Sequence, residues 1–212
     1  MTEKRTNKIV NRSQHFGQSQ KSTLRDMASE VAGFNGWRDL TMPAFGAAKG
    51  NGTPTETAFG PSGNIKQFKM ALNDSLYFTA HVDHDWLPGS LAYVHVHWSP
   101  SGTNAQPVKW EVNYTIAKGH QQAAFPEESQ IILTQTPEGV AWEHQIVEDT
   151  TGFSLIETDS LVLFEVKRVT NGATDNTDNI FLLTCDLHYQ VGQYATPQRS
   201  PDFFDLKRNP EA

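Results

Sequence analysis

From residue 65 onward, apolar and polar residues alternate along most of the chain, and this period of two constrains the fold more than any other feature. Successive side chains of a β-strand point to opposite faces, so the alternation predicts strands with one buried face. No stretch has the period of a long amphipathic helix. We therefore expect an all-β fold, a jelly roll or β-sandwich of about eight antiparallel strands. The predicted strands are 65–72, 76–82, 91–98, 108–116, 130–135, 140–147, 161–169 and 180–191.

The alternation also predicts which side chains form the core. The turn signal Asn73-Asp74 indicates that strands 65–72 and 76–82 form a hairpin. In strand 91–98, the polar face carries Leu91, Tyr93, His95 and His97. The predicted core faces are Phe68, Met70 and Leu72; Leu76, Phe78, Ala80 and Val82; Ala92, Val94, Val96 and Trp98; Val108, Trp110, Val112, Tyr114 and Ile116; and Phe181, Leu183, Cys185, Leu187, Tyr189 and Val191.

Two polar segments flank this region. Residues 1–36 read as an extended basic arm, with one helical turn at 24–32, and carry six basic against three acidic residues. Residues 192–212 read as an extended tail, and 43–64 as irregular chain rich in glycine and proline. The expected organisation is an arm at 1–36, a jelly-roll domain at 37–191 and a tail at 192–212. Arms of this kind are suited to covering the sheet edges of a neighbouring subunit.

Charge and cysteine content limit the partners. The formal net charge of −7 leaves an acidic body once the basic arm is set aside, which argues against nucleic acid as a partner. The single cysteine, Cys185, lies in an apolar run and can form neither an internal disulfide nor a thiolate metal cluster. This favours synthesis in a reducing cytoplasm. No apolar run approaches the roughly 20 residues of a membrane span, and no signal peptide is recognisable.

The histidines are the strongest chemical signal in the sequence. His81, His84, His95 and His97 lie close together with Asp83 and Asp85. His95 and His97 point the same way on a strand and could share a metal ion. Gly89 followed by His95-Val96-His97 resembles the start of the cupin metal motif. However, Ser101 and Gly102 stand at the positions where a cupin needs its glutamate, and the later histidine of the motif is not clearly placed, with His144 and His188 as candidates.

Other interpretations of the histidines compete with the cupin one. In some trimeric phage spikes a His-x-His pair from each subunit meets on the threefold axis and binds one ion. We favour a third interpretation, in which the histidines are hydrogen-bonded or lie at an interface, so we predict no cofactor. We also expect no enzyme activity, because the sequence contains no nucleophile elbow and no phosphate-binding glycine loop.

The five tryptophans admit two interpretations. Trp98 and Trp110 fall on apolar faces and predict core positions. Trp37 and Trp86 fall in predicted loops, where they could anchor contacts between subunits or stack on a glycan. We favour interfaces, and Arg5 and Arg12 of the arm are further candidate interface residues.

Several motifs in order along residues 37–200 resemble a family of uncharacterised tailed-bacteriophage proteins. That family typically shows His-Asp-Tyr/Trp-x-x-Gly-Thr, then His-x-His-Trp-x-Pro, and closes with Asp-Phe-His-Tyr-Glu. The matching segments here are Trp37-Arg38-Asp39-Leu40, Leu76-Tyr77-Phe78, His84-Asp85-Trp86-Leu87-Pro88-Gly89-Ser90, Val94-His95-Val96-His97-Trp98-Ser99-Pro100, Val108-Lys109-Trp110-Glu111-Val112-Asn113-Tyr114, Asp186-Leu187-His188-Tyr189-Gln190 and Gln198-Arg199.

This resemblance implies a structural protein of the virion, located at the capsid surface or the head–tail region. We expect a capsid decoration or cement protein that forms homo-oligomers, most naturally trimers, and bridges capsomers of the major capsid protein. The arm and tail would make the bridging contacts. An alternative is a tail- or collar-associated protein that binds a receptor glycan through Trp86 and the loop 99–107. A cupin-like metal-dependent enzyme is the third hypothesis.

Overall fold

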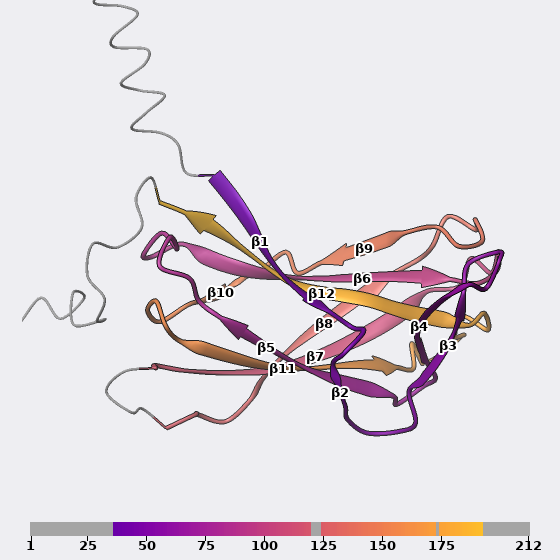
Figure 1. Ribbon diagram of the computed structural model, residues 1–212, viewed down its shortest axis with the longest axis horizontal. Helices are drawn as coiled ribbons and strands as arrows, with labels where there is room; N and C mark the ends of the chain where they lie inside the picture. Colours follow the sequence, from indigo (N-terminus) through magenta and orange to yellow (C-terminus); the bar gives the residue numbers. More distant parts are fainter. Residues whose placement is uncertain (1–35, 120–123, 173, 193–212) are drawn as a thin grey trace, which may run out of the picture. The chain divides into compact units, whose positions relative to one another are not determined.

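The computed structural model describes residues 36–119, 124–172 and 174–192, and this part of the chain is all-β (Figure 1). Its described residues contain no helix, so none that is long and apolar enough to cross a membrane. The strands are β1 (Gly36–Pro43), β2 (Ala48–Lys49), β3 (Thr55–Phe59), β4 (Ile65–Met70), β5 (Ser75–His81), β6 (Leu91–Pro100), β7 (Val108–Ala117), β8 (Ser129–Gln135), β9 (Gln145–Glu148), β10 (Phe153–Ser154), β11 (Leu161–Val169) and β12 (Ile180–Val191).

The strands form two antiparallel sheets that pack face to face. The seven-stranded sheet has the order β10-β6-β12-β4-β3, with β1 paired to β12 and β9 paired to β6. The five-stranded sheet has the order β2-β5-β11-β7-β8. In Figure 1, β6, β9 and β12 lie in one layer and β5, β7 and β11 in the other. This architecture confirms the predicted all-β sandwich.

The core lies between the sheets and consists of the inward-facing residues that the alternation predicted. Ala92, Val94, Val96 and Trp98 of β6 are completely buried. Trp110 of β7 lies 6.4 Å from Trp98, measured between ring centroids, so the two large rings fill the centre of the sandwich. Burying rings of this size contributes strongly to stability because each removes a large apolar area from water.

The pairing of the predicted strands 65–72 and 76–82 differs from the prediction. β4 pairs with β3 and β12, whereas β5 pairs with β2 and β11, so the two strands belong to different sheets and form no hairpin. The turn at Asn73, with φ of 69°, carries the chain from one sheet to the other. Leu72 falls in this crossover and is exposed, not buried as predicted.

A β-bulge in β12 changes the predicted face of its first residues. The register with β6 shifts between Leu182 and Thr184, which leaves Leu183 as the extra residue. Beyond the bulge, Cys185, Leu187 and Tyr189 face the core as predicted. Before it, Leu182 faces the core, and the ring of Phe181 instead packs against Phe59 and Trp142.

Some segment predictions were incomplete or fall outside the described residues. The stretch 43–64, predicted as irregular, contains β2 and β3, and the predicted strand 140–147 is the shorter β9. Residues 36–43 form β1, which the sequence did not predict. The arm 1–36, its helical turn at 24–32, Arg5, Arg12 and the tail 192–212 lie outside the described residues, apart from Gly36 and Gly192.

Candidate functional site

His95 and His97 lie on the outer face of the seven-stranded sheet. They alternate along β6 with the core residues Val94, Val96 and Trp98, so their side chains point away from the interior of the sandwich. A cupin-like metal centre between the sheets would need these two histidines to point inward. The alternation of β6 instead places them on the outer face.

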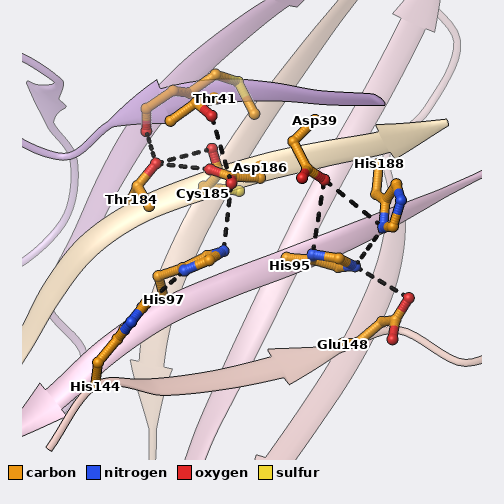
Figure 2. A network of polar contacts seen from close by, with 11 residues as sticks. Asp39, Thr41, His95, His97, His144, Glu148, Thr184, Cys185, Asp186 and His188 are labelled. Atoms are coloured by element: carbon orange, nitrogen blue, oxygen red, sulfur yellow. Dashed lines mark hydrogen bonds and ion pairs between the residues drawn. The ribbon is translucent and has the colours of Figure 1, made fainter. Parts of the chain in front are cut away.

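His95 is at the centre of the first cluster (Figure 2). Its Nε2 lies 3.0 Å from Nδ1 of His188 on β12 and 3.0 Å from Oε1 of Glu148 on β9. Asp39 on β1 is the register partner of His188, and its Oδ1 lies 3.6 Å from His188 Nδ1 and 4.0 Å from His95 Nδ1. The His95 side chain is only 13% exposed, while both carboxylates are about half exposed. The imidazole of His95 is therefore largely buried, whereas the two carboxylates around it are open to solvent.

His97 is at the centre of a second cluster on the same face. Its Nε2 lies 3.3 Å from Oδ2 of Asp186, and its Nδ1 lies 2.9 Å from Nε2 of His144 (Figure 2). Burial acts to raise the pKa of Asp186, but the contacts of His97 and Thr184 outweigh it and hold that pKa below its ordinary value. Burial, together with nearby His97, lowers the pKa of His144. Asp186 is therefore an anion that lies beside His97 and accepts a hydrogen bond from the Thr184 hydroxyl at 2.7 Å.

An aromatic side chain borders the first cluster. Trp37 of β1 contacts the ring of His188 edge-on at 4.7 Å and that of Tyr93 at 5.8 Å, measured between centroids. Trp37 remains 50% exposed. Arg38, the next residue, pairs with Tyr189 in the register of β1 and β12 and points to the opposite face of the sheet, where it forms an ion pair with Asp85. The other oxygen of Asp85 accepts a hydrogen bond from Tyr189. A large exposed ring beside a cluster of polar side chains is typical of a binding surface.

His81 and His84 form a separate group. Nε2 of His84 lies 2.9 Å and Nε2 of His81 lies 3.4 Å from Oδ1 of Asp159. The four histidines that the sequence grouped together are thus divided between this group and the two clusters around His95 and His97.

Trp86 is only 4% exposed, because its segment forms a β-bridge to Val191. The expectation of an exposed Trp86 that stacks on a glycan is therefore wrong. Cys185 is fully buried, and burial raises the pKa of its thiol, so it is the inert core residue that the sequence predicted.

The outer face of the five-stranded sheet carries a hollow of about 380 Å³. Glu165 of β11 accepts hydrogen bonds from Ser75 and from Asn113 of β7, at 2.7 and 3.1 Å. The ring of Tyr77 on β5 is 46% exposed beside them. The outward-facing residues of the lining are Tyr77, Thr79, Asn113, Thr115, Glu128, Leu163 and Glu165.

Sequence reasoning found His95 and His97 but missed the acidic partners of the first cluster. Asp39 and Glu148 lie 56 and 53 residues from His95 along the chain and reach it only through strand pairing. The sequence marks His188 as a candidate late cupin histidine and as part of the closing motif of the phage resemblance, but not as a neighbour of His95. One signal in the sequence could have found His188: Asp186 and His188 are two residues apart on β12, so both lie on its polar face.

No known protein-family model matches the sequence, and neither does the sequence of any curated protein. Solved structures give distant similarities. The C-terminal CBM6 of the laminarinase LamC from Zobellia galactanivorans is 9% identical, with a TM-score of 0.37 over 71% of this chain and 98% of that one. TmCBM61, solved with beta-1,4-galactotriose, is 14% identical, with a TM-score of 0.33 over 79% of this chain and 94% of that one.

A third similarity is to the enzymatically active domain of tailspike protein 4 from bacteriophage CBA120. It is 11% identical, with a TM-score of 0.28 over 73% of this chain and 19% of that one. Similarities at this level carry no argument about function. What they show is the fold: residues 36–119, 124–172 and 174–192 form an all-β sandwich.

Proposed function

We propose that the chain is a structural protein of a bacteriophage particle that binds other virion proteins through the outer face of its seven-stranded sheet. The observation that carries this proposal is that three separate motifs of the phage resemblance contact one another there. Trp37 and Asp39 of the first segment contact His188 of the closing motif. His95 and His97 of the middle motif contact His188 and Asp186 of the same closing motif. Motifs that recur in order along a chain and meet in space are consistent with one shared surface.

The composition of this surface fits a protein partner. The exposed Trp37 belongs to a residue type that dominates the binding energy of protein interfaces. It lies on β1, at the edge of the sheet as far as the described residues go, and the basic segment 1–35 precedes β1 in the sequence. A partner that contacts Trp37 is thus within reach of the chain's basic arm. We expect this partner to be the major capsid protein or a second copy of the chain, as in a decoration or cement protein.

Copy number tests the proposal most directly. Quantitative mass spectrometry of purified particles should find one copy per capsid subunit, or a simple fraction of that number. A handful of copies would place the protein at the tail or collar, and absence from the particle would refute the proposal.

The role of the surface is tested with matched variants. Replacing Trp37 with alanine should reduce incorporation into particles at least about tenfold, since truncating a central aromatic residue typically costs 2 kcal/mol or more of binding energy. The control is Leu72→Ala, which removes an exposed apolar side chain in the β4–β5 crossover. A chain that lacks residues 1–30 should fold but should fail to be incorporated into particles. Normal incorporation of the Trp37 variant would show that this surface is not the contact.

Glycan binding is a second candidate function, favoured by the hollow on the five-stranded sheet. An exposed tyrosine ring beside planar amide and carboxylate groups offers both the stacking surface and the hydrogen bonds that a sugar requires. A glycan array should then yield hits that Tyr77→Ala abolishes and that Ile132→Ala, an exposed residue of β8 outside the hollow, preserves. No hits with the intact protein would count against this function.

A further inference from the structure

We propose that Asp39, His95 and His188 bind one divalent transition-metal ion within a single chain. One oxygen or nitrogen atom from each side chain lies within 4.8 Å of the other two. The three residues come from β1, β6 and β12, adjacent strands of one sheet, so the backbone holds them together without a mobile loop. Imidazole nitrogen and carboxylate oxygen are common ligands of zinc and of neighbouring transition metals.

Two of the three ligand distances are close to those of a tetrahedral site, and the third, from Asp39 Oδ1 to His95 Nδ1, is 4.0 Å. Metal–nitrogen bonds of 2.0–2.1 Å at tetrahedral angles place two ligand nitrogens about 3.3 Å apart. His95 Nε2 and His188 Nδ1 lie 3.0 Å apart, and Asp39 Oδ1 lies 3.6 Å from the same His188 nitrogen. Small rotations of these side chains therefore suffice to bring three ligand atoms around one ion.

Charge and exposure favour a cation at this position. Two imidazole nitrogens at 3.0 Å must share either a proton or a positive ion, because their lone pairs otherwise repel. Asp39 and Glu148 supply two negative charges beside them, which balance a divalent ion. Glu148 Oε1 lies 3.0 Å from His95 Nε2, and its half-exposed side chain has room to become the fourth ligand. A water molecule would otherwise take that place.

This site differs from an ion shared by His-x-His pairs on a threefold axis. In that arrangement His95 and His97 of each subunit would bind the same ion. Here His97 contacts Asp186 and His144, while His95 contacts His188 and Glu148 (Figure 2). The centroids of the two rings lie 6.3 Å apart. The geometry therefore assigns His95, but not His97, to the metal site, with one ion per chain.

The test uses the full, tag-free chain after treatment with a chelator and dialysis. Isothermal titration with ZnCl₂ at pH 7.5, with the bound metal counted by mass spectrometry, should show one saturable site per chain. Co²⁺ should give the intense visible absorption bands of tetrahedral coordination. His188→Asn and Asp39→Asn should each weaken zinc binding at least about tenfold, since even outer groups of metal sites contribute that much.

The matched controls are His144→Asn and His84→Asn, which remove imidazoles from the other two groups and should leave the zinc affinity unchanged. Circular dichroism confirms that each variant is folded. Asp39 is a half-exposed residue of an edge strand, so its variant remains informative if His188→Asn unfolds the chain. The proposal is overturned by the absence of saturable binding, by one ion per three chains, or by unchanged binding in both ligand variants.

Discussion

Replacing Arg168 with methionine should destabilise the protein much more than removing an exposed charge. Arg168 is the last inward-facing residue of β11 and is only 6% exposed. Its guanidinium donates hydrogen bonds to the carbonyl of Met70 at 2.8 Å and to that of Asn176 at 2.6 Å. One side chain thus joins the end of β4 to the loop before β12. Burial lowers the pKa of this guanidinium, and Asp175 and Asp74 oppose the shift, so the group stays charged.

The expected loss follows from the two carbonyls that methionine leaves without a donor. Each unsatisfied buried acceptor costs about 1–3 kcal/mol. Removing a buried charge gives back part of this, because its desolvation is no longer required. The net loss should be about 2–4 kcal/mol. With a urea m-value of about 2 kcal/mol/M, the unfolding midpoint should fall by about 1–2 M.

Tryptophan fluorescence during urea unfolding measures this loss, since Trp98 and Trp110 are buried in the core and become exposed. Lys66→Met, an exposed substitution on β4, is the control and should change stability by no more than about 0.5 kcal/mol. Arg168→Lys should fall between the two, because one ammonium group cannot reach both carbonyls with the same geometry. If Arg168→Met is no less stable than Lys66→Met, the two carbonyls do not depend on Arg168 and the reasoning fails.

Three further predictions concern other parts of the fold. The thermal unfolding midpoint of Gly52→Ala should be well below that of Gly46→Ala, although both glycines have positive φ. An added Cβ at Gly52 would meet the side chain and backbone of Asp74, whereas at Gly46 it would meet nothing within 4 Å, and equal midpoints would contradict this. Cys185 should react with a thiol reagent only after unfolding, since it is fully buried and burial raises its thiol pKa, and rapid modification of the native protein would be evidence against its core position. Hydrogen bonds from Asn171 and Thr170 lower the pKa of Asp175, so its stabilisation is complete above the ordinary aspartate pKa and is lost as pH falls through the lowered native value. The stability difference between wild type and Asp175→Asn in urea titrations should therefore be largest near pH 7 and shrink steadily as the pH falls below the ordinary aspartate pKa.

The inward faces of the strands were predictable because alternation is a local property. Val94, Val96 and Trp98 each follow from the pattern of β6 alone, and their burial confirms the prediction. Strand pairing was not predictable in the same way, because it depends on contacts between distant segments. Asn73-Asp74 has the residues of a hairpin turn, yet the two strands it joins enter different sheets.

The candidate site could also be predicted from the sequence only in part. The shared direction of His95 and His97 follows from their spacing on one strand, and the structure places both on the outer face. The separation of His95 and His97 into two clusters depends on the pairing of β6 with β12 and of β12 with β1. The residues of β1 carry no clear alternation, so this strand could not be predicted from its sequence. Trp86 was predicted to be exposed because its segment reads as a loop, but the bridge from its backbone to Val191 draws the ring into the core.

The bulge at Leu183 gives β12 two phases within one continuous strand. Before it, even-numbered residues face the core, and after it odd-numbered residues do, which is why the side chains of Asp186 and His188 lie on the outer face. Loss of that single codon would remove the extra residue, and the regular period of two would then run unbroken from Leu182 through Thr184 to His188. His188 would keep its place on the outer face and Leu187 its place in the core. The strand can therefore lose one residue at this point without moving any proposed metal ligand to the other face of the sheet.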